Sequence, residues 1–193
     1  MTQRLPCKVC GELIHPDTAL KNDGLCMPCK GGYRESIEAG KRHREQERAY
    51  RQSAEFKFWQ SLVQRVHGSS EGYQSLSAPE RTYFAVNALV GEVYNGGFDQ
   101  FFCNSTGDYY ADALAGLRAI GAGASAELLL KAKQAVFGDL PVPAEQADRF
   151  RRMRAVDVSA ALDELDSSFY EDPDSIADLC HSFALANGLY QDG

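Results

Sequence analysis

The chain has 193 residues with a formal net charge of −7, and 44% of its residues are hydrophobic. This length and composition are typical of one globular domain with an appendage, and they allow a real hydrophobic core. No apolar run approaches the 18 or more residues of a membrane-spanning helix, so the sequence predicts no transmembrane segment.

Four cysteines near the start form two Cys-x-x-Cys pairs, Cys7 with Cys10 and Cys26 with Cys29. Each pair can hold a metal ion from one tight turn, and two such knuckles complete a tetrahedron. The spacing therefore predicts a structural Zn²⁺ site without the open coordination position of a catalytic zinc. Iron in a similar cage, redox dithiols and the disulfides of a secreted domain are the competing interpretations, and His15 is an alternative ligand.

The first residues, Met1 to Pro6, lack the apolar segment of a secretory signal. Without an export signal the thiols are expected to stay reduced, so the sequence predicts a cytoplasmic protein. The predicted zinc module, residues 1–32, is too short to bury much surface. We therefore expect the metal to supply much of the module's folding free energy.

A long helical pattern follows, from residue 33 to about residue 67. Its first part, residues 33–55, is almost wholly polar, and opposite charges recur four residues apart, as in Glu38 and Arg42. Such pairs support a solvent-exposed helix, so this part is predicted to be a charged helical linker. The later part becomes apolar at helical spacing, which predicts that it docks on the core of a third segment, residues 56–193.

Residues 56–193 read as a series of capped helices without an alternating β pattern. Ser77 and Glu80 form a capping box, and the helix that follows is predicted to stop at Asn95-Gly96-Gly97. Asp108 is predicted to cap a further helix. The expected fold is mainly α, a multi-helix globular domain preceded by a small zinc ribbon or treble-clef-like knuckle and a long exposed helix. β structure is expected only in the knuckle hairpin.

An aromatic cluster follows the two glycines, with Phe98, Phe101 and Phe102 close together in the sequence. Rings spaced this way pack into the core at a helix junction or line a pocket in which neighbouring polar side chains orient a ligand. The candidate pocket residues are Asn95, Phe98, Asp99, Gln100 and Phe101.

The negative charge is concentrated towards the C-terminus. Residues 1–55 carry 10 basic and 8 acidic residues, a balance of +2, which leaves −9 for residues 56–193. From Asp157 onward there are nine acids and no Lys or Arg. Such a face attracts a basic partner, although it can also be merely solvated. The basic residues just upstream are candidates for neutralising it within the molecule: Arg149, Arg151, Arg152 and Arg154.

Three strings of residues resemble a family of bacterial proteins. They are Asn95-Gly-Gly-Phe-Asp-Gln-Phe-Phe102, the helix Tyr109–Ile120 and Leu162-Asp-Glu-Leu-Asp-Ser-Ser-Phe-Tyr170. The chain is similar here, over roughly residues 57–187, to the DNA-mimic-protein-like family, formerly a domain of unknown function. The resemblance implies a helical domain and, from the family's named member, a partner that is a DNA-binding regulator with a helix-turn-helix. The candidate phosphate imitators are Asp163, Glu164, Asp166, Glu171, Asp172, Asp174 and Asp178.

These observations favour a non-enzymatic interaction protein with a structural zinc module, which sequesters a basic DNA-binding partner through its acidic C-terminal face. The alternative is direct nucleic-acid binding by the zinc module and the basic helix 41–51. An enzyme is not expected, because the four histidines are scattered and no phosphate-binding glycine motif is present.

Overall fold

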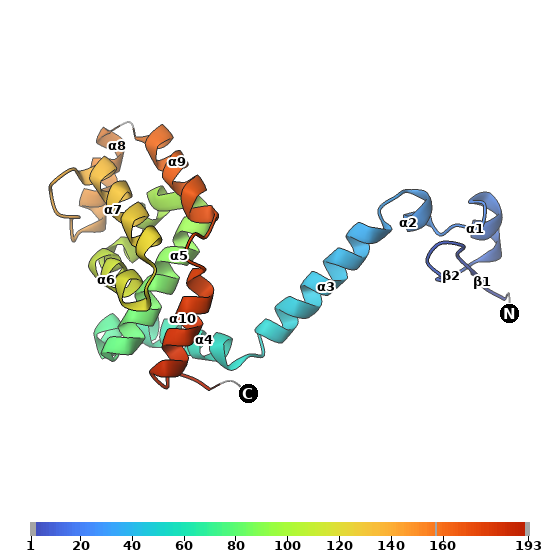
Figure 1. The fold of residues 1–193 in the computed structure, drawn as a ribbon, viewed down its shortest axis with the longest axis horizontal. Helices are drawn as coiled ribbons and strands as arrows, with labels where there is room; N and C mark the ends of the chain where they lie inside the picture. Colours follow the sequence, from blue (N-terminus) through green and yellow to red (C-terminus); the bar gives the residue numbers. More distant parts are fainter. Residues whose placement is uncertain (1–2, 157, 192–193) are drawn as a thin grey trace. The chain divides into compact units, whose positions relative to one another are not determined.

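The structure is a computed structural model that describes residues 3–156 and 158–191. The described chain divides into two compact units, with the boundary in the sequence between Gln52 and Ser53. Almost all of its regular structure is α-helical, as the sequence predicts, and the one sheet is a two-stranded hairpin in the first unit (Figure 1). No helix in the described residues has the length and hydropathy needed to span a membrane.

The first unit begins with a small hairpin and two short helices. Strands β1 (Leu5–Pro6) and β2 (Leu13–Ile14) pair antiparallel, and helices α1 (Pro16–Lys21) and α2 (Met27–Lys30) follow. Its buried apolar cluster contains Cys7, Ile14 and Cys26. A cluster of this size cannot by itself offset the conformational entropy of ordering some thirty residues.

Helix α3 (Arg34–Tyr50) completes the first unit and buries none of its residues. Ion pairs along its surface include that between Lys41 and Glu38, at 3.1 Å. The sequence predicted one continuous helix to about residue 67, and this was wrong. The chain leaves the helix after Tyr50 and starts α4 (Ala54–Gly68) anew, because the Ser53 hydroxyl caps it by accepting the Phe56 N–H at 3.1 Å.

The second unit is a bundle arranged around α5 (Ala78–Cys103), which packs against α4, α6, α8, α9 and α10 (Figure 1). Aromatic rings fill its core, and Phe98, Phe101, Phe102 and Phe169 are fully buried. The remaining elements are η1 (Gly72–Ser75), η2 (Ser105–Tyr109), α6 (Tyr110–Ile120), α7 (Gly123–Phe137), α8 (Gln146–Ala155), α9 (Ser159–Tyr170) and α10 (Ile176–Ala186).

The capping box predicted at the start of α5 is confirmed, with the Ser77 N–H donating to the Glu80 carboxylate at 2.7 Å. The cap predicted for Asp108 is not formed. The turn η2 precedes α6, and the Asp108 carboxylate instead pairs with the guanidinium of Arg149 at 2.7 Å.

Arg149 on α8 is fully buried although it is charged. Its guanidinium donates to the backbone carbonyls of Phe102, Asn104, Pro143 and Ala144 at 2.7–3.0 Å. One side chain thus joins the end of α5, the connector before α8 and α8 itself. A buried charge is tolerated only when its hydrogen bonds are satisfied, and here the carbonyls and Asp108 supply acceptors for all three nitrogens.

Candidate metal centre and acidic face

The sequence-predicted metal ligands come together in the first unit. The thiol sulfurs of Cys7, Cys10, Cys26 and Cys29 all lie within 4.8 Å of one another. The first pair lies in the turn between β1 and β2, which ends at Gly11 with φ +72°. The second pair lies at the start of α2, where Cys26 is the N-cap residue. The hairpin of β1 and β2 therefore supplies one cysteine pair, and the start of α2 supplies the other.

The distances fit a tetrahedral ion. A Zn–S bond of about 2.3 Å implies sulfur–sulfur distances of about 3.8 Å in a tetrahedron, and the Cys10 and Cys26 sulfurs are 3.7 Å apart. A disulfide bond is about 2.0 Å long, and all the cysteines are free thiols. His15 is outside the cluster, because its side chain caps α1 by accepting the Asp17 N–H. These four thiols can hold a metal ion, and in the described residues no other potential ligand residue belongs to the group.

The backbone favours a thiolate at the first of these cysteines. Hydrogen bonds from the backbone at Cys10, Cys26 and Val9 lower the pKa of the Cys7 thiol to about 6. Burial and the neighbouring thiols of Cys26, Cys10 and Cys7 raise the pKa of Cys29 to about 12. Thiolates this close repel one another, so a bound cation is needed before all four can ionise.

The candidate acidic residues lie on the last two helices and on the segment between them. Figure 1 shows α9 and α10 following each other along one side of the bundle. Asp163, Glu164 and Asp166 are on α9, and Asp178 is in the first turn of α10. Glu171, Asp172 and Asp174 lie in the connection between the two helices. The acids Asp157 and Asp192 lie outside the described residues.

Three of the seven carboxylates have structural roles within the chain. Asp174 accepts the backbone N–H and the hydroxyl of Ser125, both at 2.7 Å. Asp172 accepts the Ile176 N–H at 2.9 Å at the start of α10, and Asp166 accepts the Phe98 N–H at 2.8 Å. These residues are partly buried and hold elements together.

The other four carboxylates, those of Asp163, Glu164, Glu171 and Asp178, belong to exposed residues. Among the described residues, no ion pair joins these acids to the arginines of α8. Arg149 is buried in its carbonyl cage and Arg151 pairs with Asp148. We call Asp163, Glu164, Glu171 and Asp178 the acidic face, and in the described residues none of them forms an ion pair with an arginine of α8.

The contact between Asp166 and Phe98 joins two of the sequence strings that carry the family resemblance. Gly97 breaks α5 with φ +76° and ψ −177°, a backbone conformation that residues with a side chain rarely adopt. A Cβ there would lie 2.1 Å from the Asp166 carboxylate. The carboxylate thus caps the second half of α5, while the rings of Phe98 and Phe169 pack edge to face at 5.5 Å. The two sequence strings therefore supply contacts that hold α5 and α9 together in the bundle.

Replacing Gly97 with alanine should destabilise the bundle by about 2–3 kcal/mol, because strain in the backbone adds to displacement of Asp166. Gly121 is the matched control: it also has a positive φ, of +90°, but nothing lies within 4 Å of its missing Cβ. Gly121→Ala should cost only the backbone term, about 1 kcal/mol. Urea unfolding of both variants measures the difference, and equal losses would contradict the role of Asp166.

The candidate pocket residues are divided among different environments. Phe98 and Phe101 are fully buried in the core. Asn95 and Gln100 line a groove beside α4, and Asp99 lines a smaller cavity beside α9. Asp166 also lines that second cavity. Burial raises the pKa of its carboxyl group, and the nearby carboxylates of Asp163 and Asp99 raise this pKa further, whereas the hydrogen bond from the Phe98 N–H lowers it.

Comparison with known proteins identifies a family. A family model described as DMP19-like protein matches residues 74–187, more than half of the chain, all within the second unit. No curated protein and no solved structure matches the sequence. The cysteine cluster and α3 lie outside the matched region.

Proposed function

The chain belongs to the DMP19-like protein family, and from this premise we propose that its helical unit is a non-enzymatic DNA mimic. It sequesters a basic DNA-binding protein, of the class of helix-turn-helix regulators, in the cytoplasm. The observation that carries the proposal is the acidic face, whose four residues are exposed and form no ion pair with the arginines of α8 in the part of the chain that the structure describes. A protein that binds phosphates presents a basic surface, and such a surface is attracted to carboxylates held in a fixed array.

The positions of two of these residues support the proposal. Glu164 lies on α9 and Glu171 is the C-cap residue of that helix. Residues seven apart in a helix lie two turns apart on one side of it, about 10.5 Å along the axis. The helix therefore holds the two residues at fixed positions on one side. Asp174 supports their position by fastening the connection after α9 to α7.

We propose that the cysteine cluster binds one structural Zn²⁺ through Cys7, Cys10, Cys26 and Cys29. The ion would neutralise the thiolates and hold the hairpin to α2, and it would have no open position for catalysis. The segment that holds the cysteine cluster would serve as a second recognition element, separate from residues 74–187, which match the family model.

Reversing three charges of the acidic face, with Asp163, Glu164 and Glu171 all changed to Lys, should abolish partner binding. Stability should change little, because these residues are exposed and their side chains form no hydrogen bond or ion pair within the described residues. Partners captured from a bacterial lysate by the parent protein should be lost by the variant, and their binding should weaken steeply between low and physiological salt.

The matched control makes the same change in net charge elsewhere on the helical unit, with Glu71, Glu127 and Glu145 changed to Lys. All three are exposed. This variant should retain the partner. Loss of binding in both variants would indicate a response to net charge alone, and binding indifferent to salt and to the acidic-face reversal would contradict the DNA-mimic proposal.

Direct nucleic-acid binding by α3 is the second candidate. Arg44, Arg48 and Arg51 line a shallow depression on its surface, although Glu47 lies among them and pairs with Arg51. If this surface binds nucleic acid, the intact protein should shift labelled DNA or RNA in a salt-dependent way and Arg44→Glu should remove the shift. The DNA-mimic proposal expects no shift.

A further inference from the structure

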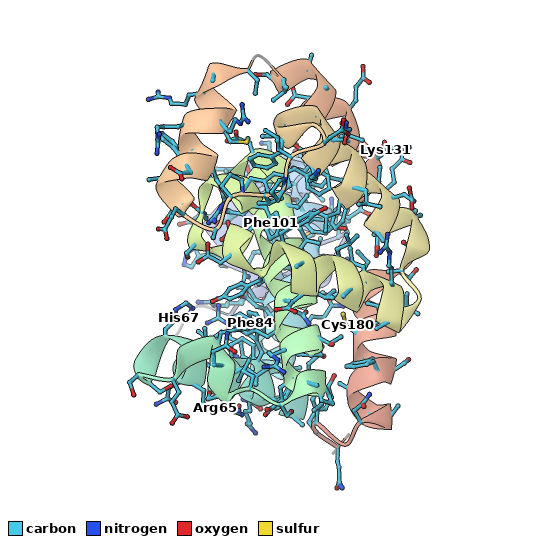
Figure 2. All side chains as sticks on the ribbon, turned by 90° about the vertical axis from the view of Figure 1, so that its left-hand side faces the viewer. Arg65, His67, Phe84, Phe101, Lys131 and Cys180 are labelled. Atoms are coloured by element: carbon cyan, nitrogen blue, oxygen red, sulfur yellow. The ribbon has the colours of Figure 1, made fainter. Side chains whose placement is uncertain are left out.

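A groove of about 470 Å³ lies between α4, α5 and η2, and the proposed function does not use it. Its lining includes Trp59 and Val63 of α4 and Phe84, Gly91 and Glu92 of α5. Figure 2 labels Phe84 and His67, both of which line this groove where α4 meets α5. The groove therefore combines an aromatic wall with a carboxylate.

The Glu92 carboxylate is fixed by three neutral donors. It accepts from the side-chain amides of Gln100 at 2.6 Å and Asn104 at 2.9 Å, and from the Thr106 hydroxyl at 3.1 Å. Gly96 makes this possible, because a Cβ there would lie 2.3 Å from the Gln100 amide oxygen. In the described part of the chain no ion pair includes Glu92. The negative charge is thus held in place without a counter-charge.

These hydrogen bonds determine which polar groups a ligand would meet. A carboxylate only accepts hydrogen bonds, so the amides of Gln100 and Asn104 must turn their NH₂ groups towards Glu92. Their amide oxygens and the remaining lone pairs of Glu92 are then left as acceptors. A ligand that fits must supply donors and positive charge, and a ligand with a carboxylate or phosphate would be repelled.

We propose that this groove binds a guanidinium group carried on an apolar stem, as in an arginine side chain. A guanidinium is planar, has five N–H donors and no acceptor, and remains charged at all relevant pH values. Its stem and plane would pack against the aromatic wall, in which the rings of Trp59 and Phe84 stack with their centroids 5.3 Å apart, and a cation gains from lying over an aromatic ring. The site lies on α4, α5 and η2, whereas the acidic face lies on α9, α10 and the connection between them, so the two proposals stand or fall separately.

Trp59 provides a direct test, because it is the only tryptophan in the chain and it lines the groove. The full-length protein is titrated with the peptide acetyl-Gly-Arg-Gly-amide while tryptophan fluorescence is recorded. We expect a saturable change, and none with the same peptide containing citrulline, which replaces the guanidinium by a neutral urea. N-acetyl-arginine amide forms the second arm: a peptide that binds more tightly than this small molecule assigns the ligand to a protein partner, and equal binding assigns it to a free metabolite.

Two variants locate the site. Glu92→Gln should weaken binding at least tenfold by removing the charge, while Glu127→Gln, which removes an exposed charge from α7, should leave the affinity unchanged. Gly91→Leu should block the groove without loss of stability, since nothing lies within 4 Å of the missing Cβ and leucine favours a helix more than glycine does. An equal response to the citrulline peptide, no saturable response in the folded parent, or undiminished binding by Gly91→Leu would each overturn the proposal.

Discussion

Replacing Arg149 with methionine should lower the free energy of unfolding of the helical unit by about 3–5 kcal/mol. Methionine keeps much of the apolar stem but removes every hydrogen bond of the guanidinium. Four backbone carbonyls, one buried and three partly buried, would lose their donor, and an unsatisfied buried acceptor costs about 1–3 kcal/mol. The expected loss is a large fraction of the 5–15 kcal/mol typical of a whole domain.

Urea unfolding followed by circular dichroism measures this loss. Arg151→Met is the matched control, because Arg151 is on the same helix but its side chain is 76% exposed and forms an ion pair with Asp148 at the surface. That change should stay within about 0.5 kcal/mol of the parent. A loss below about 1 kcal/mol for Arg149→Met would contradict the role of the buried guanidinium.

Removing the metal should unfold residues 3–32, which we call the cysteine module, and leave the helical bundle intact. We expect elemental analysis of the purified protein to give one zinc per chain and Cys26→Ser to abolish it. Binding of structural zinc contributes about 10–16 kcal/mol in small zinc domains, whereas the module's apolar cluster buries only a few side chains. The backbone amides of the cysteine module should therefore lose their protection against hydrogen exchange in the Cys26→Ser variant.

The helical unit should keep its melting temperature in Cys26→Ser, because its own core contains none of the four cysteines. Cys103→Ser is the control, since Cys103 is outside the metal cluster, and this variant should retain the zinc. Protein that lacks metal but keeps protected amides in residues 3–32 would contradict the proposal.

Local signals made much of this structure predictable. The cysteine spacing brought four thiols together because each pair needs only one tight turn, and the capping box at Ser77 formed because its partners are three residues apart. The break before α4 was not predicted, because the pairs of opposite charges in α3 favour a continuous helix and outweighed the capping signal of Ser53.

Contacts between distant residues could not be predicted from local patterns. Asp108 satisfies the capping pattern but lies beside a buried arginine that comes 41 residues later. Asp166 looked like one more surface acid, and only the packing of α9 against α5 shows that it caps the helix at Phe98, 68 residues earlier in the sequence. Glu92 carried no sequence signal, because its three donors come from a helix end and a turn that assemble only in the folded unit.

The most direct test of the DNA-mimic proposal is competition between this protein and DNA. The captured DNA-binding partner is bound to a fluorescent duplex that carries its site, and the protein is added while anisotropy is recorded. The account predicts that anisotropy falls to the value of free duplex, and that the Asp163, Glu164 and Glu171 reversal variant leaves it unchanged. A ternary complex, in which the protein binds the partner while the duplex stays bound and the anisotropy rises, would contradict it.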